Sequence, residues 1–504
     1  MERSRLHSRY MASLTLAVVV CAARAGPLQD AEKELFAARY KSAAELYAKI
    51  VQADPAQTAA CYGLVRSLIS DHRSHEAYRA AEEALRRSPQ TAATQTAVGL
   101  AAYRRGDLND AEAYFRSALQ MDAGFAGALQ GMASLSRVFS NFKTARDLAL
   151  AAYRSSPGDP QVIIAYANTL KGAEHIAALR KALAVLDPES EKARELRAHV
   201  ADDVAAGDRD LRRLVSPPEK TTIKLVPILS GPSRLRGFGL RVQLNRRQTV
   251  QLLLDTGASG ISLSPKTAVR AGLELLGDQS ADVKGIGDEQ SPTAYEYIAS
   301  RIRIGDVEFA DYPISIFRAA RSADFDGLIG ADVFKTFIVK IDFPRFELSL
   351  EPRLGGASSD SGEFVDAPPP AAGFHRAMRF GNHLTVPTLI NGAKSALFLI
   401  DSGAFDNLID TETGSEASKL HLIGPGAVKG IQGKVEQTSF SDRVSLVFAG
   451  FRQDNPRLLA ISLEKISDEM GVALGGILGM QLLRQMALTI DYREGTVGLE
   501  YRKP

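Results

Sequence analysis

The sequence predicts a multidomain protein in which an N-terminal all-α solenoid precedes an all-β region made of two similar lobes. Three observations predict this arrangement: a repeat of 34 residues in the first half, alternating strand-like segments after residue 216, and one short motif that occurs twice in the second half. With 504 residues, the chain has room for about three domains.

The overall composition is that of an ordinary globular protein. Hydrophobic residues make up 45% of the chain and charged residues 24%. The formal net charge is +2, and the sequence has no long basic block that could neutralise a row of phosphates. A nucleic-acid partner is therefore not expected.

Residues 1–25 have the order of charges and apolar residues that is typical of a secretory signal peptide. Three arginines precede the apolar run Met11–Ala23, and the A-x-A triplet Ala23–Ala25 ends the segment. The run is shorter than the roughly 20 residues of a membrane span. We expect export to the periplasm, the cell surface or the medium of a bacterium, with no stable membrane span after cleavage. A short buried helix is the alternative.

The two cysteines bear on the same question. Cys21 could carry the lipid of a lipoprotein, but Val20 is larger than the residue that such signals usually have there, so this anchor is the less favoured interpretation. Cleavage after residue 25 leaves only Cys61, which excludes an internal disulfide. An exported protein without disulfides fits a bacterial periplasm better than a small disulfide-rich scaffold.

Residues 26–215 repeat with a period of 34 and predict the helical array. Four columns keep this interval through four units: Pro55, Pro89, Ala123 and Pro157; Ala43, Ala77, Ala111 and Ala145; Tyr47, Ala81, Phe115 and Ala149; Val51, Leu85, Leu119 and Tyr153. These units resemble tetratricopeptide repeats, which pack two antiparallel helices through small residues and stack into a superhelix. Helical runs over 163–170 and 177–186 predict a degenerate last repeat and a cap.

Two interpretations of the array remain open: a concave surface for a peptide or partner protein, and a structural spacer. No residue in it has a spacing that suggests chemistry. Its histidines are scattered, and we expect surface or hydrogen-bonded side chains rather than metal ligands at His72, His75, His175 and His199.

The β-rich half begins after the helix-breaking stretch Ser216–Pro218. The run 239–245 alternates apolar and polar residues, Arg246 and Arg247 form a turn, and the run 250–254 returns, which predicts a hairpin ending at Asp255. The predicted boundaries are 223–353 for the first lobe, 354–373 for a Gly/Ser- and Pro-rich linker, and 374–504 for the second lobe.

The two lobes share four landmarks in the same order. LLLDTGA at 252–258 corresponds to FLIDSGA at 398–404, and GIG at 285–287 corresponds to GIQG at 430–433. GLIG at 327–330 then corresponds to GILG at 476–479, and VKIDF at 339–343 to LTIDY at 488–492. This order predicts an internal duplication of one all-β lobe.

The shared pattern resembles the aspartic peptidases, and the DTGA, DSGA and GIG forms resemble the retropepsin-like branch more than pepsin itself. The resemblance covers about 280 residues, from 223 to 504. It implies that Asp255 and Asp401 are the two catalytic carboxyl groups. Like charges at close range raise one pKa, so such a pair holds one shared proton. One Asp then acts as base toward a water and the other polarises the scissile carbonyl, with no metal or cofactor.

The resemblance also implies roles for the neighbouring residues. Thr256 and Ser402 would hydrogen-bond across the pair, and Gly257 and Gly403 would allow the carboxyl groups to approach closely. Two flap tips would close over a peptide, formed by Gly285, Ile286 and Gly287 and by Gly430, Ile431 and Gly433.

Several further residues have two possible roles. Phe405 and Asp406 are expected either to set substrate specificity or to be ordinary loop residues. Gly330 and Gly479 are expected to be structural. Turn and surface positions are expected for Asp342 and Asp491, rather than catalytic or metal-binding ones.

The sequence predicts an aspartic endopeptidase that acts on peptides or proteins, with an array that recruits substrates or partners. HExxH, CxxC, GxSxG and P-loop motifs do not occur, so metalloprotease, serine hydrolase and nucleotide-binding functions lack their residues. A non-catalytic peptide-binding protein is the alternative, favoured by the unusual run 405–407. We expect a monomer in which the lobes pair within one chain; lobes that face apart and pair with other chains are the remaining possibility.

Overall fold

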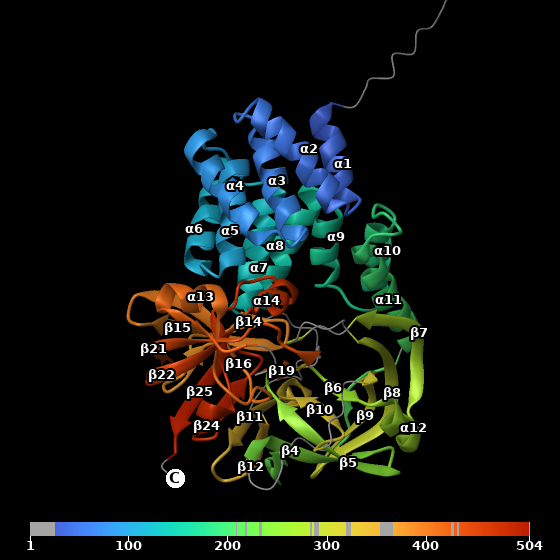
Figure 1. The fold of residues 1–504 in the computed structure, drawn as a ribbon. Helices are drawn as coiled ribbons and strands as arrows, with labels where there is room; N and C mark the ends of the chain where they lie inside the picture. Colours follow the sequence, from blue (N-terminus) through green and yellow to red (C-terminus); the bar gives the residue numbers. More distant parts are fainter. Residues whose placement is uncertain are drawn as a thin grey trace, which may run out of the picture.

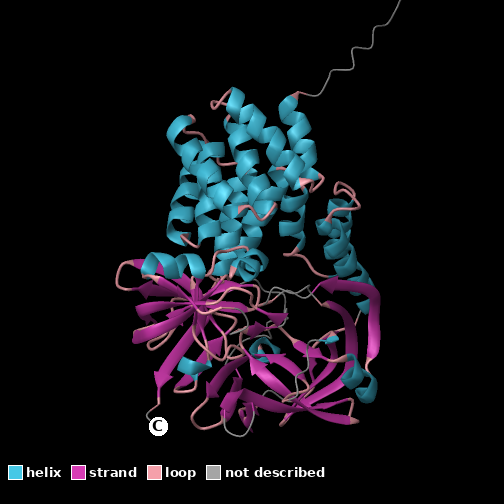
Figure 2. Cartoon of the chain, viewed as in Figure 1, coloured by secondary structure: helices cyan, strands magenta, loops and turns pink. Residues whose placement is uncertain are grey.

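A computed structural model describes residues 26–207, 209–216, 219–230, 234–282, 285–286, 292–318, 324–352, 366–424, 428–430 and 433–502. The predicted signal peptide, residues 1–25, lies outside the described residues. Helices of the N-terminal part form one layer, and this layer rests on a β-rich region that contains most of the second half (Figures 1 and 2). The predicted all-α solenoid and all-β region are therefore confirmed.

The solenoid consists of paired antiparallel helices. Their bounds are α1 (Pro27–Phe36), α2 (Tyr40–Ala53), α3 (Thr58–Ser70), α4 (Ser74–Arg87), α5 (Ala92–Arg105), α6 (Leu108–Met121), α7 (Ala126–Val138), α8 (Phe142–Ser155), α9 (Pro160–Ala167), α10 (Gly172–Leu183) and α11 (Glu191–Ala206). Pro55 and Pro89 lie in the connections between successive pairs, where their rings cannot break a helix. No helix among the described residues is long and apolar enough to cross a membrane.

Small residues set the distances between neighbouring helices of the array, both within a pair and between successive pairs. Ala43, Ala77 and Ala111 are completely buried. A Cβ atom added to Gly63 would stand 2.3 Å from the ring of Tyr47 on the preceding helix. The repeated alanines and these glycines therefore allow the close crossings that the 34-residue period predicts.

The end of the array differs from the prediction in its boundaries. The predicted runs 163–170 and 177–186 correspond to α9 and α10, which begin and end three to five residues earlier. Asp159 caps α9 by accepting a hydrogen bond from the backbone NH of Gln161, and Pro160 occupies the first helical position. Helix α11 is a further helix beyond these two runs, and the side chain of Ser190 caps it.

The first and last parts of the array contact each other. Arg66 on α3 donates a 2.7 Å hydrogen bond to Asp159 at the start of α9, and both side chains are buried. Arg39, which follows α1, forms a 2.9 Å ion pair with Asp187 in the α10–α11 connection. The array thus curls until side chains of α3 and α9 contact each other on its inner face.

The first lobe has a nine-stranded sheet. Its elements are β1 (Arg213–Leu214), β2 (Thr221–Lys224), β3 (Val226–Ser230), β4 (Arg234–Leu244), β5 (Gln248–Asp255), β6 (Ile261–Leu263), α12 (Pro265–Ala271), β7 (Glu274–Asp282), β8 (Thr293–Ile304), β9 (Val307–Ile316), β10 (Gly327–Gly330), the 3-10 helix η2 (Ala331–Phe334), β11 (Phe337–Asp342) and β12 (Glu347–Pro352). The strand order of the nine-stranded sheet is β1-β9-β6-β10-β5-β4-β8-β7, with β3 paired to β4. Strands β2, β11 and β12 of this lobe belong to a separate sheet. Strand β1 comes from the segment assigned to the solenoid cap.

The second lobe repeats this design in an eight-stranded sheet. Its elements are β13 (His375–Arg376), β14 (Met378–Phe380), β15 (His383–Ile390), β16 (Lys394–Ile400), β17 (Leu408–Asp410), α13 (Thr411–Ala417), β18 (Leu420–Leu422), β19 (Lys429–Gly430), β20 (Gly433–Lys434), β21 (Ser439–Phe448), β22 (Phe451–Ile461), α14 (Glu464–Met470), β23 (Gly476–Leu478), α15 (Met480–Leu483), β24 (Met486–Asp491) and β25 (Thr496–Tyr501). The strand order of the eight-stranded sheet is β14-β15-β16-β23-β17-β22-β21-β18, and β19 and β20 form a separate two-stranded sheet. Strands β13, β24 and β25 of this lobe belong to another sheet.

A third sheet joins the lobes, with the order β13-β25-β24-β11-β12-β2. Strands β11 and β24, the last matching landmarks of the two lobes, pair antiparallel at its centre. Asp342 and Asp491 end these strands, and each accepts backbone hydrogen bonds in the following turn. The expected turn roles are therefore found, but the expected surface positions are wrong, because both side chains are buried beneath the turns.

The solenoid is attached to both lobes. Arg104 at the end of α5 is 4% exposed; it donates hydrogen bonds to the carbonyl of Ser467 and the carboxylate of Asp468 on α14. Apolar side chains of α5, α6 and α7 share one buried cluster with the second lobe. At the first lobe, Ala206 of α11 packs with Leu276 of β7.

Candidate active site

Two equivalent strands deliver the two predicted catalytic residues. Asp255 is the last residue of β5, and Asp401 directly follows β16. The apolar runs before them, 252–254 and 398–400, are buried on both faces, which favours parallel pairing inside the lobes. Strand β10 pairs parallel with β5, and β23 pairs parallel with β16. In each lobe, therefore, a buried strand with a parallel neighbour leads to the catalytic candidate, which lies at the boundary with the other lobe.

The hydroxyl groups of Thr256 and Ser402 bind the two loops to each other. The backbone NH of Thr256 donates to Ser402 Oγ at 3.0 Å, and the NH of Ser402 donates to Thr256 Oγ1 at 2.9 Å. Each hydroxyl then donates at 2.8 Å to a carbonyl of the opposite strand, Thr256 to Ile400 and Ser402 to Leu254. These four bonds are buried and link positions 144 to 148 residues apart.

The glycines beside the acids leave space for the opposite carboxyl group. A Cβ atom on Gly257 would stand 2.5 Å from Cγ of Asp401, and one on Gly403 would stand 2.4 Å from Cγ of Asp255. Real Cβ atoms do not approach other atoms so closely, so each position requires glycine. The structure thus brings together the six predicted dyad residues, 255–257 and 401–403.

Backbone amides and burial set the electrostatics of the pair. The NH of Gly257 donates to Asp255 Oδ1 at 2.9 Å, while Asp401 Oδ1 accepts from the NH groups of Gly403 at 2.7 Å and Ala404 at 3.0 Å. Burial, followed by the neighbouring charge of Asp401 and a hydrogen bond with it, raises the pKa of Asp255 well above its usual range. Such a pair can hold one proton where two separate aspartates would hold none.

The second glycine landmark supports each loop from behind. A Cβ on Gly330 would stand 2.5 Å from the carbonyl oxygen of Ala258, and one on Gly479 would stand 2.3 Å from that of Asp406. The NH of Gly330 donates to the carbonyl of Gly260 at 2.7 Å. In the second lobe the equivalent NH, of Gly479, donates at 2.8 Å to the side chain of Asn407.

Asp332 is a site-supporting residue that the sequence patterns did not indicate. It accepts a 2.9 Å hydrogen bond from the NH of Gly260 and a 2.8 Å bond from Asn382 Nδ2 of the second lobe. Burial raises the pKa of this carboxyl. Its place two residues after the GLIG landmark was a possible signal, but the second lobe has Gln481 at that position.

The predicted flap tips approach each other at the junction with the solenoid. The Cβ position of Gly430 lies 2.3 Å from the carbonyl oxygen of Ile286. Gly285 directly precedes Ile286, and Gly433 begins β20. Gly287 and Ile431 lie outside the described residues. Ile286 packs against the buried cluster that contains Val435 and the solenoid side chains. A role of these segments as flaps stays a prediction.

Phe405 and Asp406 follow the second catalytic loop and are half-buried. The carbonyl of Phe405 accepts a 3.0 Å hydrogen bond from the NH of Gln481, and the backbone of Asp406 packs on Gly479. These backbone contacts fix the loop, and the predicted contribution of the side chains to specificity stays a prediction.

One family model and several solved structures resemble parts of this chain. Residues 240–333 match the family model described as aspartyl protease. No curated protein matches the chain. A solved aspartic proteinase from Irpex lacteus is 13% identical, covers 56% of this chain and 98% of its own, and has a TM-score of 0.37. Conglutin gamma, a basic 7S globulin from lupine seeds, is 8% identical, covers 57% and 96%, and has a TM-score of 0.33. Through residues 240–333, the first lobe of this chain is similar to the aspartyl protease family.

Proposed function

We propose that this chain is an aspartic endopeptidase that hydrolyses peptide bonds with a water held by Asp255 and Asp401. The observation that carries the proposal is the reciprocal bonding of Thr256 and Ser402, which holds two carboxyl groups from separate lobes in contact. A site of this kind needs two acids on one water, and it needs them held rigidly.

The raised pKa of Asp255, beside the carboxyl group of Asp401, supports a pair that holds one shared proton, and we assign that proton to Asp255. Asp255 retains the shared proton and donates it to the carbonyl oxygen of the substrate. Asp401 accepts a proton from the water, whose oxygen attacks the carbonyl carbon. The C–N bond of the tetrahedral diol then breaks as Asp401 gives its proton to the departing amine. A hydroxyl of the diol returns a proton to Asp255 as it becomes the carbonyl of the product acid, and both carboxyl groups are back in their starting state. No covalent intermediate forms between protein and substrate.

The alternative, a non-catalytic peptide-binding protein, rests on the unusual run 405–407. Asn407 in this run has a structural role that is compatible with catalysis. Its side chain accepts a hydrogen bond from the NH of Gly479, just as the carbonyl of Gly260 accepts one from the equivalent NH of Gly330 in the first lobe. The departure is therefore weaker support for loss of activity than the sequence alone indicates.

The solenoid is proposed to present protein substrates or partners to the site. Its contact with Ile286 and Val435 supports an effect on the predicted flaps. A peptide lying along the inner face of α3 would have to displace the Arg66–Asp159 pair. Recruitment would therefore use the outer helices or the two ends of the array.

A peptide-library digest from acidic to neutral pH tests the peptidase proposal. We expect cleavage by the wild type, and a loss of about 10²-fold or more in kcat/KM for Asp255→Asn and for Asp401→Asn alone. A peptide mimic with a central hydroxyl should inhibit the wild type. Asp454→Asn is the matched control, because this lobe-2 carboxylate is exposed and paired only with neighbouring surface groups, and it should cleave normally.

Near-wild-type cleavage by either dyad variant would exclude one shared site. Binding of peptides by the wild type without cleavage at any pH would favour the alternative function. Circular dichroism of each variant separates these outcomes from simple unfolding.

A further inference from the structure

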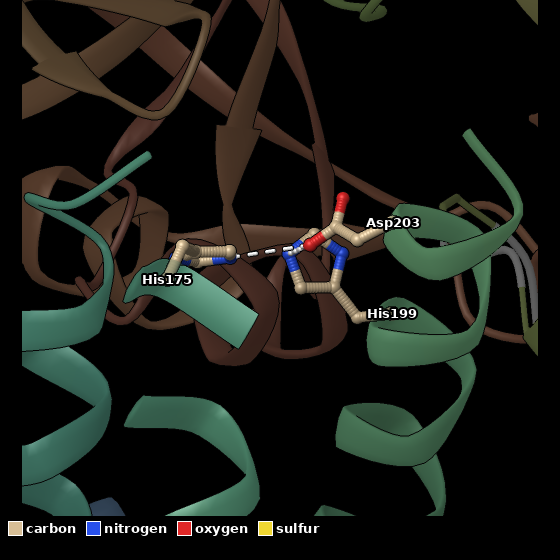
Figure 3. A group of neighbouring side chains, drawn as sticks. All are labelled: His175, His199 and Asp203. Atoms are coloured by element: carbon tan, nitrogen blue, oxygen red, sulfur yellow. Dashed lines mark ion pairs between the residues drawn. The ribbon is translucent and has the colours of Figure 1, made fainter. Parts of the chain in front are cut away.

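Three side chains with metal-binding chemistry converge where α10 packs on α11, in the cap of the solenoid (Figure 3). His175 comes from α10, and His199 and Asp203 lie one turn apart on α11, so that they share one face of that helix. One ligand atom from each lies within 4.8 Å of the others. The two histidines lie far apart in the sequence, but the packing of α10 on α11 brings them together.

The orientation of His175 suits a metal ligand. Its Nδ1 lies 2.7 Å from the carbonyl oxygen of Ala167, so this nitrogen carries the hydrogen and the lone pair is left on Nε2. Figure 3 shows Nε2 directed toward Asp203. Metal-bound histidines generally donate their other NH to such an acceptor, which fixes both the tautomer and the ring orientation.

One distance between the ligand atoms equals the edge of a tetrahedral site, and a second is about 0.5 Å longer. Asp203 Oδ2 lies 3.3 Å from His175 Nε2 and 3.8 Å from His199 Nε2. Two ligands about 2.0 to 2.1 Å from a tetrahedral zinc ion are about 3.3 Å apart. Asp203 Oδ2 is buried and makes no hydrogen bond within the described part of the chain, so a cation between the three atoms would satisfy it.

We propose that His175, His199 and Asp203 bind one divalent transition-metal ion of the zinc class, with water as the fourth ligand. Imidazole and carboxylate are ligands that zinc accepts. His199 is 54% exposed and His175 only 15%, which leaves an entry path on one side and a protected ligand on the other. The ion would fix α10 to α11 and thereby stiffen the helix that packs on β7, the strand leading to Gly285.

Metal titration of the full chain tests this proposal. The purified protein is treated with a chelator, dialysed, and titrated with ZnCl2 by calorimetry and with CoCl2 by visible absorption. We expect one equivalent of metal per chain and the strong visible bands of four-coordinate cobalt. His199→Gln and Asp203→Asn should each weaken binding at least tenfold. His75→Gln removes a comparably exposed histidine elsewhere on the solenoid and should bind as the wild type does.

His199 is the decisive position. Because its side chain is exposed, we expect His199→Gln to fold normally, so that a loss of binding reports the lost ligand. The far-UV circular dichroism spectrum checks that this variant is folded. Absence of stoichiometric binding by the wild type would overturn the proposal and leave an ordinary histidine–aspartate ion pair. Equal affinity of His199→Gln and the wild type would overturn it as well.

Discussion

Thr256 and Ser402 make the same bonds in opposite directions, so that the two lobes hold each other through a pseudo-symmetric pair. Each hydroxyl accepts one NH and donates to one carbonyl across the lobe boundary. Removing either hydroxyl would leave an NH and a carbonyl buried without a partner, which costs about 1 to 3 kcal/mol for each group. The acids themselves receive backbone NH groups, whose positions depend on the fold alone.

The raised pKa of Asp255 predicts a specific pH dependence of stability. The unfolded chain releases this proton near pH 4, at about the ordinary pKa of Asp, whereas the native state holds it to higher pH. The stabilisation is therefore fully present below about pH 4 and is lost as the pH rises through the native pKa. The loss is about 1.4 kcal/mol for each pH unit between the two values.

Chemical denaturation of the wild type and Asp255→Asn at a series of pH values measures this effect. We expect the wild type to lose free energy of unfolding above about pH 4 relative to the Asn variant, which cannot titrate at that position. Parallel curves for the two proteins would contradict a proton shared by Asp255 and Asp401.

At the scale of elements, glycine and alanine determine how closely the solenoid helices cross. A Cβ on Gly99 of α5 would stand 2.7 Å from the ring of Phe115 on α6, and that ring is completely buried. Alanine normally stabilises a helix by about 1 kcal/mol relative to glycine, but overpacking of a core costs about 1 to 3 kcal/mol. We expect Gly99→Ala to lower stability overall, as measured by thermal melting.

Gly158 provides the matched control for that substitution. It lies in the α8–α9 connection, and a Cβ there would meet no atom within 4 Å. Gly158→Ala should change stability by no more than about 0.5 kcal/mol. A stabilised Gly99→Ala variant would show that the Phe115 ring can move aside.

The elements that were predictable from the sequence are those with a local pattern. The columns of the 34-residue repeat mark the helix pairs, and the apolar runs before Asp255 and Asp401 mark β5 and β16. The repeat period and the length of an apolar run can both be read directly from the sequence. Asp332 could not be found in this way, since its partner Asn382 comes from the other lobe. The pairing of His175 with His199 likewise depends on how α10 packs on α11.

At the scale of the whole molecule, the solenoid and the second lobe share one interior. Arg104 connects them through Ser467 and Asp468, and its Nε also donates to Ser74 Oγ at 2.9 Å. Breaking a buried ion pair by removing one partner typically costs about 3 to 5 kcal/mol. We expect Arg104→Met to destabilise the protein by about 3 kcal/mol and to separate the unfolding of the solenoid from that of the lobes.

Arg105, the next residue of α5, is the control for this prediction. Its side chain is 52% exposed and pairs with Asp107 at the surface, so Arg105→Met should cost no more than about 1 kcal/mol. Urea denaturation followed by circular dichroism measures both variants. A single transition of unchanged midpoint for Arg104→Met would show that the apolar contacts alone join the two parts.

The sheet that joins the lobes can form only late during synthesis, because it pairs strands that are far apart in the sequence. Its central strand β11 has no partner on one side until β24, which ends at Asp491, has been made. Asp491 comes 149 residues after Asp342, the last residue of β11 (491 − 342), and at 5 to 20 residues per second the ribosome needs roughly 7 to 30 s to add them. For that interval the first lobe exposes an open strand edge, which is prone to wrong pairing, and the loop of Asp255 lacks the completed second lobe to which it bonds. Under the proposed function, the site would therefore be held in its final geometry only after β24 has paired with β11.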